Sequence, residues 1–391
     1  MGNFPPDIRV EKELKTLTKK HDIFLLCNGR KGEILKENRD SINIRRVPLS
    51  FKRSISQFDI FTKQKSKFWF NIISNFVKTN NIEILHVHDL PLVGVSKQVA
   101  LIYGIKVVAD LHENYPAMLK ENARIPYLQV RNIGNFTLKL FYSERNWRKF
   151  ESSVLHKCDA IITVIEEAKI RLLKHKLDST KIFVVPNYNL ISKHDTISSN
   201  VKPPDDSFSL IYAGGVAETR DLSTLIKSLV NVKFSKPRLK LIIVGANSSS
   251  KIRLENIAST HGVQDLVEVL EWVSREKAEA LMNQATVGLV PHRKSEHTDT
   301  TIPHKLFQYM YRSMPVIVSN CEPLERIVVN SNCGLVYESG NSLSLSKCIN
   351  TLYNNSSLCS EFGENGRSVC IKKFNWDYCE KVLLDMYSNL S

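Results

Sequence analysis

Short apolar runs alternate with helix-like segments along almost the whole chain, and this alternation limits the fold more than any other feature. Many runs contain no polar residue, which is typical of parallel strands that helices cover on both faces. Strands separated by helices form right-handed β-α-β units and hence parallel sheets. The expected strands are Asp22–Cys27, Ile82–His88, Lys106–His112, Ala160–Ile165, Ile182–Pro186, Ser209–Gly214, Leu239–Gly245, Val267–Val273, Val287–Pro291, Pro315–Ser319 and Gly334–Tyr337.

The alternation breaks once, at residues 192–206. This segment, SKHDTISSNVKPPDD, is polar, contains two prolines and has no period, a composition that favours a linker. Two α/β domains are expected, because 391 residues exceed one ordinary core. The predicted parts are residues 1–195, residues 207–372 and a last amphipathic helix in 373–391, which would pack back on the first domain.

The chain carries a net charge of +14 and eight scattered cysteines with no CxxC pair. The thiols are typical of a reduced cytoplasmic protein. The basic charge is compatible with nucleic acid, anionic lipid or phosphorylated small molecules, and equally with a Lys-rich composition that has no functional patch. No RRM, KH, helix-turn-helix or zinc pattern occurs, so a nucleic-acid partner is not expected.

Ligands of open parallel sheets bind beyond the carboxyl ends of the strands, so the residues that follow strands are the candidates for a site. The strand 209–214 ends in YAGGVAETRDLSTLI. Gly214 and Gly215 would let the backbone approach a ligand, and Arg220 near the next helix start suits a diphosphate. A tight turn between strand and helix is the alternative explanation of the glycines.

The stretch HTDTTIPHKLFQYM places a second anion site before the strand at 315–319. Pro303 suits the first turn of a helix, and Thr300 or Thr301 would cap it or bond a ligand. Lys305 in that turn opposes the helix dipole, a misfit that a bound anion would resolve. Gln308 shares its face. The alternative is a solvated helix face.

Three histidines occur at or near strand ends in the first half. His112, in VVADLHENYP, would orient a reacting hydroxyl or a leaving group; a hydrogen-bonded structural histidine is the alternative. His86 and His88, in LHVHDLP, have the spacing of metal ligands, but the sequence shows no obvious third ligand, so no metal site is predicted.

Basic and aromatic residues are interleaved in residues 131–150, RNIGNFTLKLFYSERNWRKF. The segment predicts either peripheral contact with an anionic membrane surface or a packed helix whose basic side chains reach the solvent. The expected location is therefore the cytoplasm, including the inner face of the membrane.

The ordered motifs resemble the retaining GT-B glycosyltransferases of family 4. The first half carries FPPDIRVEKELKTLTKKHDIFLLC, ILHVHD, VVADLHE and WRKFESSVLHKCDAIITVIEEAKIRL. The second carries VVPNYN, YAGGVAETRDLSTLI, LIIVG, VLEWVSREKAEALMNQATVGLVP and TIPHKLFQYMYRSMPVIVSNCEPLERIVVNSNCGLVY. The resemblance implies two Rossmann-like domains facing a cleft, with the acceptor on the first domain and a nucleotide-sugar donor on the second.

The resemblance also implies roles for single residues. Arg220 and Lys305 would hold the diphosphate at the Gly214 turn, and His112 would be the active-site histidine of the first domain. Trp272 and Val273 would grip the base, while Asp7 and Arg9 would lie near the cleft. Two glutamates eight positions apart are common in this family, and their positions are Thr300 and Gln308 here; Gly215 replaces a frequent arginine.

A third departure concerns the first strand of the family, which normally precedes FPPDIRV. Only Met1-Gly2-Asn3 stand before Phe4. The sequence therefore predicts a first domain without that strand, with lowered stability. Adding an upstream strand should raise the melting temperature or the turnover.

The predicted function is transfer of a sugar, with retention, from a nucleoside-diphosphate sugar to a hydroxyl, in cell-surface polysaccharide or lipid-linked glycan synthesis. It would be a hexosyltransferase without a cofactor, in which Arg220, Lys305 and helix N-termini stabilise the diphosphate so that no metal is needed. The absence of Asp-x-Asp is consistent with this expectation. One alternative is a nucleotide-sugar epimerase of the same architecture, for which Glu113 is the one well-placed carboxylate. The other is a basic nucleic-acid-binding protein.

Overall fold

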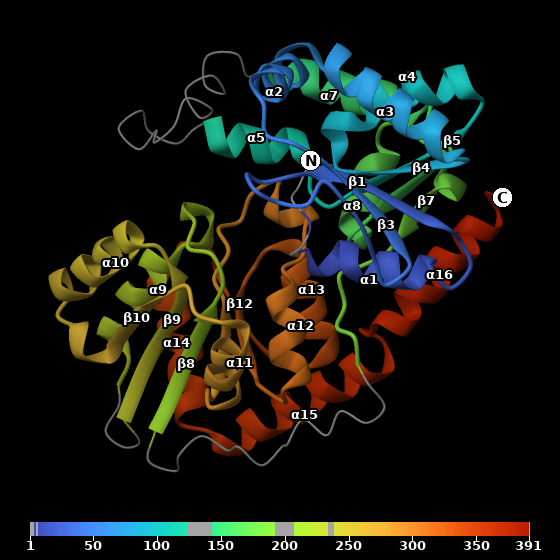
Figure 1. The fold of residues 1–391 in the computed structure, drawn as a ribbon. Coiled ribbons are helices and arrows are strands. Elements are labelled where there is room, and N and C mark those ends of the chain that lie inside the picture. The colour runs from blue at the N-terminus through green and yellow to red at the C-terminus, as the bar shows by residue number, and fades with distance from the viewer. Residues whose placement is uncertain (1–3, 5–6, 124–142, 192–206, 234–237, 391) are drawn as a thin grey trace. The chain divides into compact units, whose positions relative to one another are not determined.

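The computed structural model describes residues 4, 7–123, 143–191, 207–233 and 238–390. The described chain divides into two compact units (Figure 1). Unit 1 comprises Met1–Asn187 and Cys379–Ser391, and unit 2 comprises Tyr188–Tyr378. The predicted linker, residues 192–206, lies outside the described residues.

The described residues of unit 1 form two sheets. One has the order β1-β3-β2 and the other the order β4-β5-β6-β7. β1 is parallel to β3, with Ile23 opposite Ile42, whereas β2 is antiparallel to β3; the second sheet is parallel throughout. The strands are β1 (Ile23–Asn28), β2 (Lys36–Arg39), β3 (Ile42–Val47), β4 (Ile84–His88), β5 (Lys106–Leu111), β6 (Ala160–Thr163) and β7 (Ile182–Val184).

Several helices of unit 1 begin at a polar N-cap residue. Ser50, Ser66 and Ser143 each accept a backbone hydrogen bond at a helix start, as N-cap residues do. The apolar faces of the helices meet around Trp69 and Trp147, which are fully buried. The helices are α1 (Ile8–Leu17), α2 (Phe51–Lys63), α3 (Lys67–Asn80), η1 (Leu90–Leu92), α4 (Val93–Tyr103), α5 (Tyr115–Ala123), α7 (Glu144–Leu155), α8 (Glu166–Leu173) and η3 (Ser179–Lys181), joined by the end of α16 (Trp376–Ser388).

In unit 2, the part of the chain that the structure describes forms one parallel sheet of six strands in the order β10-β9-β8-β11-β12-β13. The chain builds outward from β8 in one direction and then returns to build from β11 in the other. The β8/β11 pair is thus the point where the strand order reverses. The strands are β8 (Ser207–Ala213), β9 (Arg238–Ala246), β10 (Val267–Glu271), β11 (Val287–Val290), β12 (Val316–Ser319) and β13 (Gly334–Tyr337).

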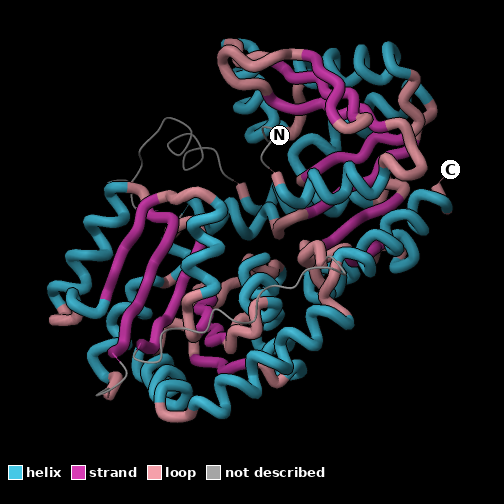
Figure 2. Tube along the Cα trace, turned by 60° about the horizontal axis from the view of Figure 1, so that its bottom comes forward, coloured by secondary structure: helices cyan, strands magenta, loops and turns pink. Residues whose placement is uncertain are grey.

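Helices lie against the strands of unit 2 in both views (Figure 2). The strands β11 and β12 are buried at every position, which explains their uninterrupted apolar sequences. The helices are η4 (Glu218–Arg220), α9 (Leu222–Ser228), η5 (Leu229–Asn231), α10 (Ser248–Thr260), η6 (Gln264–Leu266), α11 (Arg275–Asn283), η7 (Thr298–Thr300), α12 (His304–Tyr311), α13 (Glu322–Ser331), α14 (Ser342–Tyr353), α15 (Ser356–Lys372) and the start of α16.

Every strand predicted from the sequence overlaps an observed strand, and the predicted α/β class with parallel sheets is confirmed. The prediction missed β2 and β3. β2 reads Lys-Glu-Asn-Arg and is mostly exposed, so it lacks the apolar run that marks the other strands. β3 reads Ile-Asn-Ile-Arg-Arg-Val, and its arginines hide the strand signal.

All eight cysteines lie within the described residues and none forms a disulfide; six of them are buried. Burial raises the pKa of Cys158 and of Cys333 to about 12, so these thiols stay protonated at neutral pH. None of the described helices combines the length and the apolar content needed to cross a membrane.

Candidate active site

A cationic cluster in unit 2 lies at the carboxyl ends of β8 and β11. Gly214 follows β8 directly, His292 follows β11, and Arg220 ends the short helix η4. Lys305 stands in the first turn of α12. The structure therefore gathers three residues predicted from the sequence, Gly214, Arg220 and Lys305, where the strand order reverses, which is where open α/β sheets bind ligands.

Gly214 makes the close approach possible. Its φ is +144°, a conformation that side chains disfavour. A Cβ atom at this position would lie 2.7 Å from the Nζ atom of Lys305. Two tyrosines hold the turn: the Ala213 N–H donates to Tyr309 Oη at 2.9 Å, and Tyr212 Oη donates to the Gly215 carbonyl at 2.7 Å.

Lys305 is held in an unusual setting for an ammonium group. Its Nζ atom lies 3.6 Å from the centre of the Tyr212 ring, a cation–π contact. Burial, together with the charge of Arg220, lowers the pKa of Lys305 well below its ordinary value. A neighbouring anion would favour the protonated form and raise this pKa again.

Arg220 contacts a buried histidine that sequence reasoning did not single out. Its Nη1 atom lies 2.8 Å from Nε2 and 3.1 Å from Nδ1 of His292 and donates to the ring. Burial, then the charges of Arg220 and Lys305, lowers the pKa of His292 well below its usual range. The imidazole is neutral and serves as an acceptor that orients the guanidinium.

Among the described residues, neither Arg220 nor Lys305 forms an ion pair with a carboxylate. The ion pairs of unit 2 lie elsewhere, for example between Lys240 and Glu268 and between Lys294 and Asp299. Two neighbouring cations without a counterion raise each other's energy in a partly buried site. The arrangement is therefore suited to an external anion with more than one charge, such as a diphosphate.

The expected base-binding residues follow β10, which ends at Glu271, so Trp272 and Val273 belong to the loop rather than to the strand. Trp272 is 71% exposed, whereas Val273 is partly buried. A Cβ atom on Gly215 would lie 3.9 Å from Cζ2 of Trp272. The indole thus stands beside the glycine turn with its ring largely open to a ligand.

The loop that contains Thr300 and Thr301, called the threonine loop below, does not cap the helix as expected. Thr300 and Thr301 do not cap α12; their hydroxyls donate to the His297 carbonyl at 3.2 and 3.1 Å. Pro303 is itself the N-cap residue and not a first-turn residue. The hydroxyls brace the loop. Gln308 lies on the partly buried side of α12, one turn beyond Lys305.

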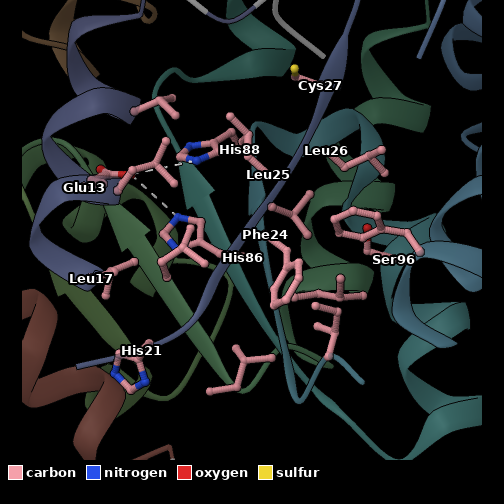
Figure 3. A pocket seen from close by; sticks show the side chains of 18 of the residues that line it. Glu13, Leu17, His21, Phe24, Leu25, Leu26, Cys27, His86, His88 and Ser96 are labelled. Carbon is pink, nitrogen blue, oxygen red and sulfur yellow. Dashed lines mark ion pairs between the residues drawn. The ribbon is translucent and has the colours of Figure 1, made fainter. Parts of the chain in front are cut away.

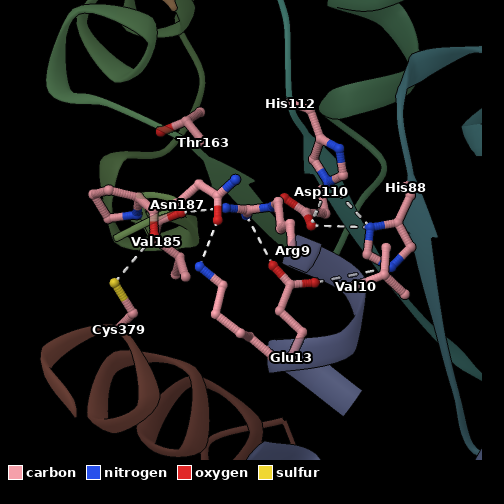
Figure 4. Close-up of polar contacts among 12 residues, drawn as sticks. Arg9, Val10, Glu13, His88, Asp110, His112, Thr163, Val185, Asn187 and Cys379 are labelled. Atoms are coloured by element: carbon pink, nitrogen blue, oxygen red, sulfur yellow. Dashed lines mark hydrogen bonds and ion pairs between the residues drawn. The ribbon is translucent and has the colours of Figure 1, made fainter. Parts of the chain in front are cut away.

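A second polar cluster lies in unit 1, around Arg9 (Figure 4). Arg9 is buried and donates to the Val185 carbonyl at 2.7 Å and to Asp110 at 2.8 Å, and it pairs with Glu13 at 3.0 Å. Asp7 caps α1 by accepting from the backbone N–H groups of Arg9 and Val10. Both predicted residues, Asp7 and Arg9, are therefore engaged within unit 1 and have structural tasks there.

His112 belongs to the same cluster. Its Nε2 atom lies 3.0 Å from Asp110 and 3.1 Å from Nδ1 of His88. Burial lowers the pKa of His112, but the Asp110 carboxylate outweighs it and raises the pKa to about 9. His112 is thus protonated at neutral pH, and it can donate a hydrogen bond but is a poor general base.

The four side chains of Glu13, His86, His88 and Asp110 offer atoms within 4.8 Å of one another. The sequence shows no obvious third ligand beside His86 and His88, whereas the structure brings Glu13 (Figure 3) and Asp110 next to them from distant parts of the chain. Arg9 already sits against both carboxylates. A metal ion would have to compete with that guanidinium, so the structure gives no reason to replace the prediction that metal is not bound.

Sequence reasoning did not single out the supporting residues of either cluster. His292, Tyr212, Tyr309 and Glu13 form no recognisable motif, and their importance arises from burial. The one available signal for His292 was its position in VPH, directly after a predicted strand, the same criterion that had selected Gly214 and His112.

Comparison with known families now adds to this geometry. Residues 9–188 match the model of Glycosyltransferase Family 4, and residues 193–369 match that of Glycosyl transferases group 1. The two matches together cover nearly all of both units. The chain belongs to the group 1 glycosyltransferases with the GT-B fold.

Individual relatives agree with this assignment. The chain is 26% identical over 277 residues to the uncharacterized glycosyltransferase MJ1178 of Methanocaldococcus jannaschii, covering 70% of this chain and 72% of the relative. It is 23% identical over 188 residues to the capsular polysaccharide biosynthesis glycosyltransferase CapM of Staphylococcus aureus, covering 47% of each.

Solved structures share the fold. A sucrose-phosphate synthase from Thermosynechococcus elongatus superposes with a TM-score of 0.76 at 15% identity, covering 98% of this chain and 92% of that one. HepE of Anabaena, solved in complex with UDP, superposes with a TM-score of 0.64 at 13% identity, covering 89% and 87%.

Proposed function

We propose that the protein transfers a sugar from a nucleoside-diphosphate sugar to a hydroxyl acceptor, with retention at the anomeric carbon. The observation that carries the proposal is a pair of cations, Arg220 and Lys305, at the Gly214 turn of a glycosyltransferase fold. Neither pairs with a carboxylate of the residues that the structure describes. HepE, a structural neighbour, was solved with UDP. UDP-sugars are therefore the first donors to test.

Charge stabilisation is the chemistry that the cluster supplies. As the glycosidic bond breaks, negative charge grows on the diphosphate, and Arg220 and Lys305 are arranged to stabilise it. With two cations from the chain, the proposed hexosyl transfer needs no metal. Retention follows when the acceptor attacks from the face that the diphosphate leaves, with a phosphate oxygen taking the acceptor's proton.

The test replaces Arg220 by alanine. Loss of one preorganised charge should lower turnover by about 100-fold or more, measured as UDP release with UDP-, GDP-, dTDP- and ADP-sugars. The exposed Arg275, which pairs with Glu279, provides the control as Arg275→Ala. Near-normal turnover of Arg220→Ala would refute the assignment.

Product analysis decides between transfer and the epimerase alternative, since an epimerase converts the donor without an acceptor. Glu113, the carboxylate that the epimerase would use, is exposed. No feature of the described residues favours the epimerase, and the family models match glycosyltransferases. We propose cell-surface polysaccharide or lipid-linked glycan synthesis as the setting. The name of the relative CapM, which refers to capsular polysaccharide biosynthesis, supports the first of these.

Peripheral membrane contact is part of this proposal, but through a different segment from the one predicted. Residues 124–142 lie outside the described residues, and the described remainder of the predicted segment, in α7, buries Trp147. In α2, by contrast, Phe51 is 81% exposed and Ile55 is 46% exposed. The exposed Lys52 and Lys63 accompany them, a combination that suits an anionic lipid surface.

Vesicle cosedimentation tests the membrane contact. Binding to vesicles with phosphatidylglycerol should exceed binding to pure phosphatidylcholine, and Phe51→Ser with Ile55→Ser should reduce it severalfold. The matched control is Leu101→Ser in α4, which is also exposed. Equal loss with the control would refute a specific role for α2.

A further inference from the structure

The amine of Lys305 has no hydrogen-bond acceptor and no ion pair among the residues that the structure describes. Its Nζ atom lies instead against the face of the Tyr212 ring, 3.6 Å from the ring centre. Elsewhere in unit 2, Lys240 pairs with Glu268 at 2.6 Å. Lys305 thus lacks the acceptors that usually favour the protonated form of a lysine side chain.

A small molecule can reach this amine. Lys305 is only half-buried. The buried side-chain atoms without a partner include Tyr337 Oη but not Lys305 Nζ, so the amine is open to solvent. Gly214 keeps the space beside it clear, since a Cβ atom there would lie 2.7 Å from Nζ. The amine is therefore accessible at the turn that follows β8.

Arg220 acts on this amine and also offers a place for an anion. Burial, and then the charge of Arg220, lowers the pKa of Lys305, so at a given pH more of this amine is unprotonated than of an exposed lysine. A lysine beside another cation is a known type of activated nucleophile. The guanidinium contacts the neutral ring of His292 and can bind a phosphate group. A nucleophile and an anion-binding group thus stand together.

We propose that Lys305 is a modification site that forms a reversible imine with small phosphorylated aldehydes, whose phosphate group Arg220 binds. Nζ adds to the aldehyde carbon and forms a carbon–nitrogen bond. The carbonyl oxygen then leaves as water and takes both hydrogens of the neutral amine, so the step needs no oxidant or reductant. Imine formation is independent of the sugar transfer, whereas its inhibition of donor binding rests on the proposed function.

The two side chains together select this class of compound. An aldehyde without an anionic group would gain nothing from Arg220, and a phosphate ester without a carbonyl group would form no covalent bond. Guanidinium groups bind phosphate through paired hydrogen bonds. The imine nitrogen, once protonated, keeps a positive charge beside that phosphate. A phosphorylated aldehyde therefore competes with a nucleotide for the same two side chains.

The experiment treats the purified full chain with pyridoxal phosphate, reduces the imine with borohydride to a stable secondary amine, and locates the label by peptide mass spectrometry. Lys305 should react about tenfold faster or more than Lys277, an exposed lysine that also lies in the first turn of its helix. Pyridoxal, the same aldehyde without the phosphate, should label Lys305 about tenfold less.

Variants and UDP connect the label to the site. Arg220→Gln removes the phosphate partner and should slow the labelling of Lys305 about tenfold. Excess UDP should slow it in the wild type. After treatment and reduction, the wild type should bind UDP about tenfold more weakly or less, whereas Lys305→Arg, which keeps the cation but forms no imine, should bind UDP as before treatment. Circular dichroism checks that each variant is folded.

Two outcomes would overturn the proposal. One is labelling of Lys305 no faster than that of Lys277, and the other is equal labelling of Lys305 by pyridoxal and by pyridoxal phosphate. Selective labelling that excess UDP does not slow would uphold the nucleophile and would contradict the proposed place of the diphosphate. The two proposals can therefore fail separately, because the turnover test of Arg220→Ala uses no aldehyde.

Discussion

The polar clusters of the two units differ in whether their charged side chains have counterions. In unit 1, Arg9 is surrounded by Asp110 and Glu13, and the neighbouring His112 gains a proton. In unit 2, Arg220 and Lys305 lie together with a neutral histidine and without a carboxylate partner among the described residues. One cluster carries its own counterions, whereas the other leaves its charge to be balanced from outside.

We interpret this difference as one between a structural cluster in unit 1 and the proposed binding cluster in unit 2. Compensated buried charges hold distant segments together, since Arg9 joins α1 to β5 and to the residue after β7. Uncompensated charges cost stability and gain affinity, because a bound anion removes the repulsion. Mutations should therefore affect folding in unit 1 and ligand binding in unit 2.

The largest expected effect is the loss of Arg9. Arg9→Met would leave the buried carboxylates of Asp110 and Glu13 without their cation, which typically costs about 3–5 kcal/mol. Hydrogen exchange, followed separately for peptides of unit 1 and unit 2, measures the change. The matched Arg220→Met variant should leave the stability of unit 2 unchanged or slightly raised. Equal destabilisation by both variants would erase the distinction between the clusters.

A smaller effect concerns His112 and pH. Its folded pKa of about 9 exceeds the ordinary value of 6.5, so its stabilisation is complete below pH 6.5 and is lost as pH rises toward 9. The full contribution is on the order of 3 kcal/mol. Urea unfolding of the wild type and of His112→Asn, compared at several pH values, measures it. A stability difference that does not shrink with rising pH would contradict the prediction.

Glu13 and Lys12 also titrate near this pH range, so the pH dependence of the wild type alone does not report His112. Burial raises the pKa of Glu13 to about 7 and lowers that of Lys12 to about 8. As pH rises, the contribution of Glu13 to stability falls between about 4.5 and about 7, and that of Lys12 rises between about 8 and about 10.5, so both overlap the range in which His112 titrates. The difference between wild type and variant reports His112 together with its effect on Glu13, whose pKa the charge of His112 lowers.

The smallest expected effect lies in unit 2, where Lys305 should take up a proton when a diphosphate binds. Because its pKa is lowered in the free site, UDP affinity should fall by up to tenfold per pH unit above that pKa. Calorimetry between about pH 7.5 and about pH 9 avoids titration of the phosphate itself. Lys305→Met should bind more weakly with a flat profile. A flat wild-type profile would show that Lys305 stays protonated.

The sequence predicted the fold well because strands buried on both faces need uninterrupted apolar runs. It predicted Gly214, Arg220 and Lys305 as neighbours of one ligand because each follows a strand or begins a helix. Their supports could not be predicted. The Arg220–His292 contact and the Arg9–Asp110 pair join residues 72 and 101 positions apart, and such pairs depend on side-chain packing that leaves no periodic signal.

The threonine loop shows the opposite case, in which a local pattern was misleading. Threonines ahead of a helix commonly cap it, but Thr300 and Thr301 donate to carbonyls behind them. The turn η7 competes for the same hydroxyls. Side chains with two possible local partners cannot be assigned from spacing alone.

The buried cysteines of each unit can report local unfolding of that unit through their chemical reactivity. Cys27, Cys158 and Cys379 belong to unit 1, and Cys321, Cys333 and Cys370 to unit 2; all six are buried. A maleimide reagent can modify them only after the surrounding chain separates and admits solvent. The order in which these thiols react would reveal which unit opens first, and a UDP-sugar that binds unit 2 would delay the labelling of its three cysteines alone.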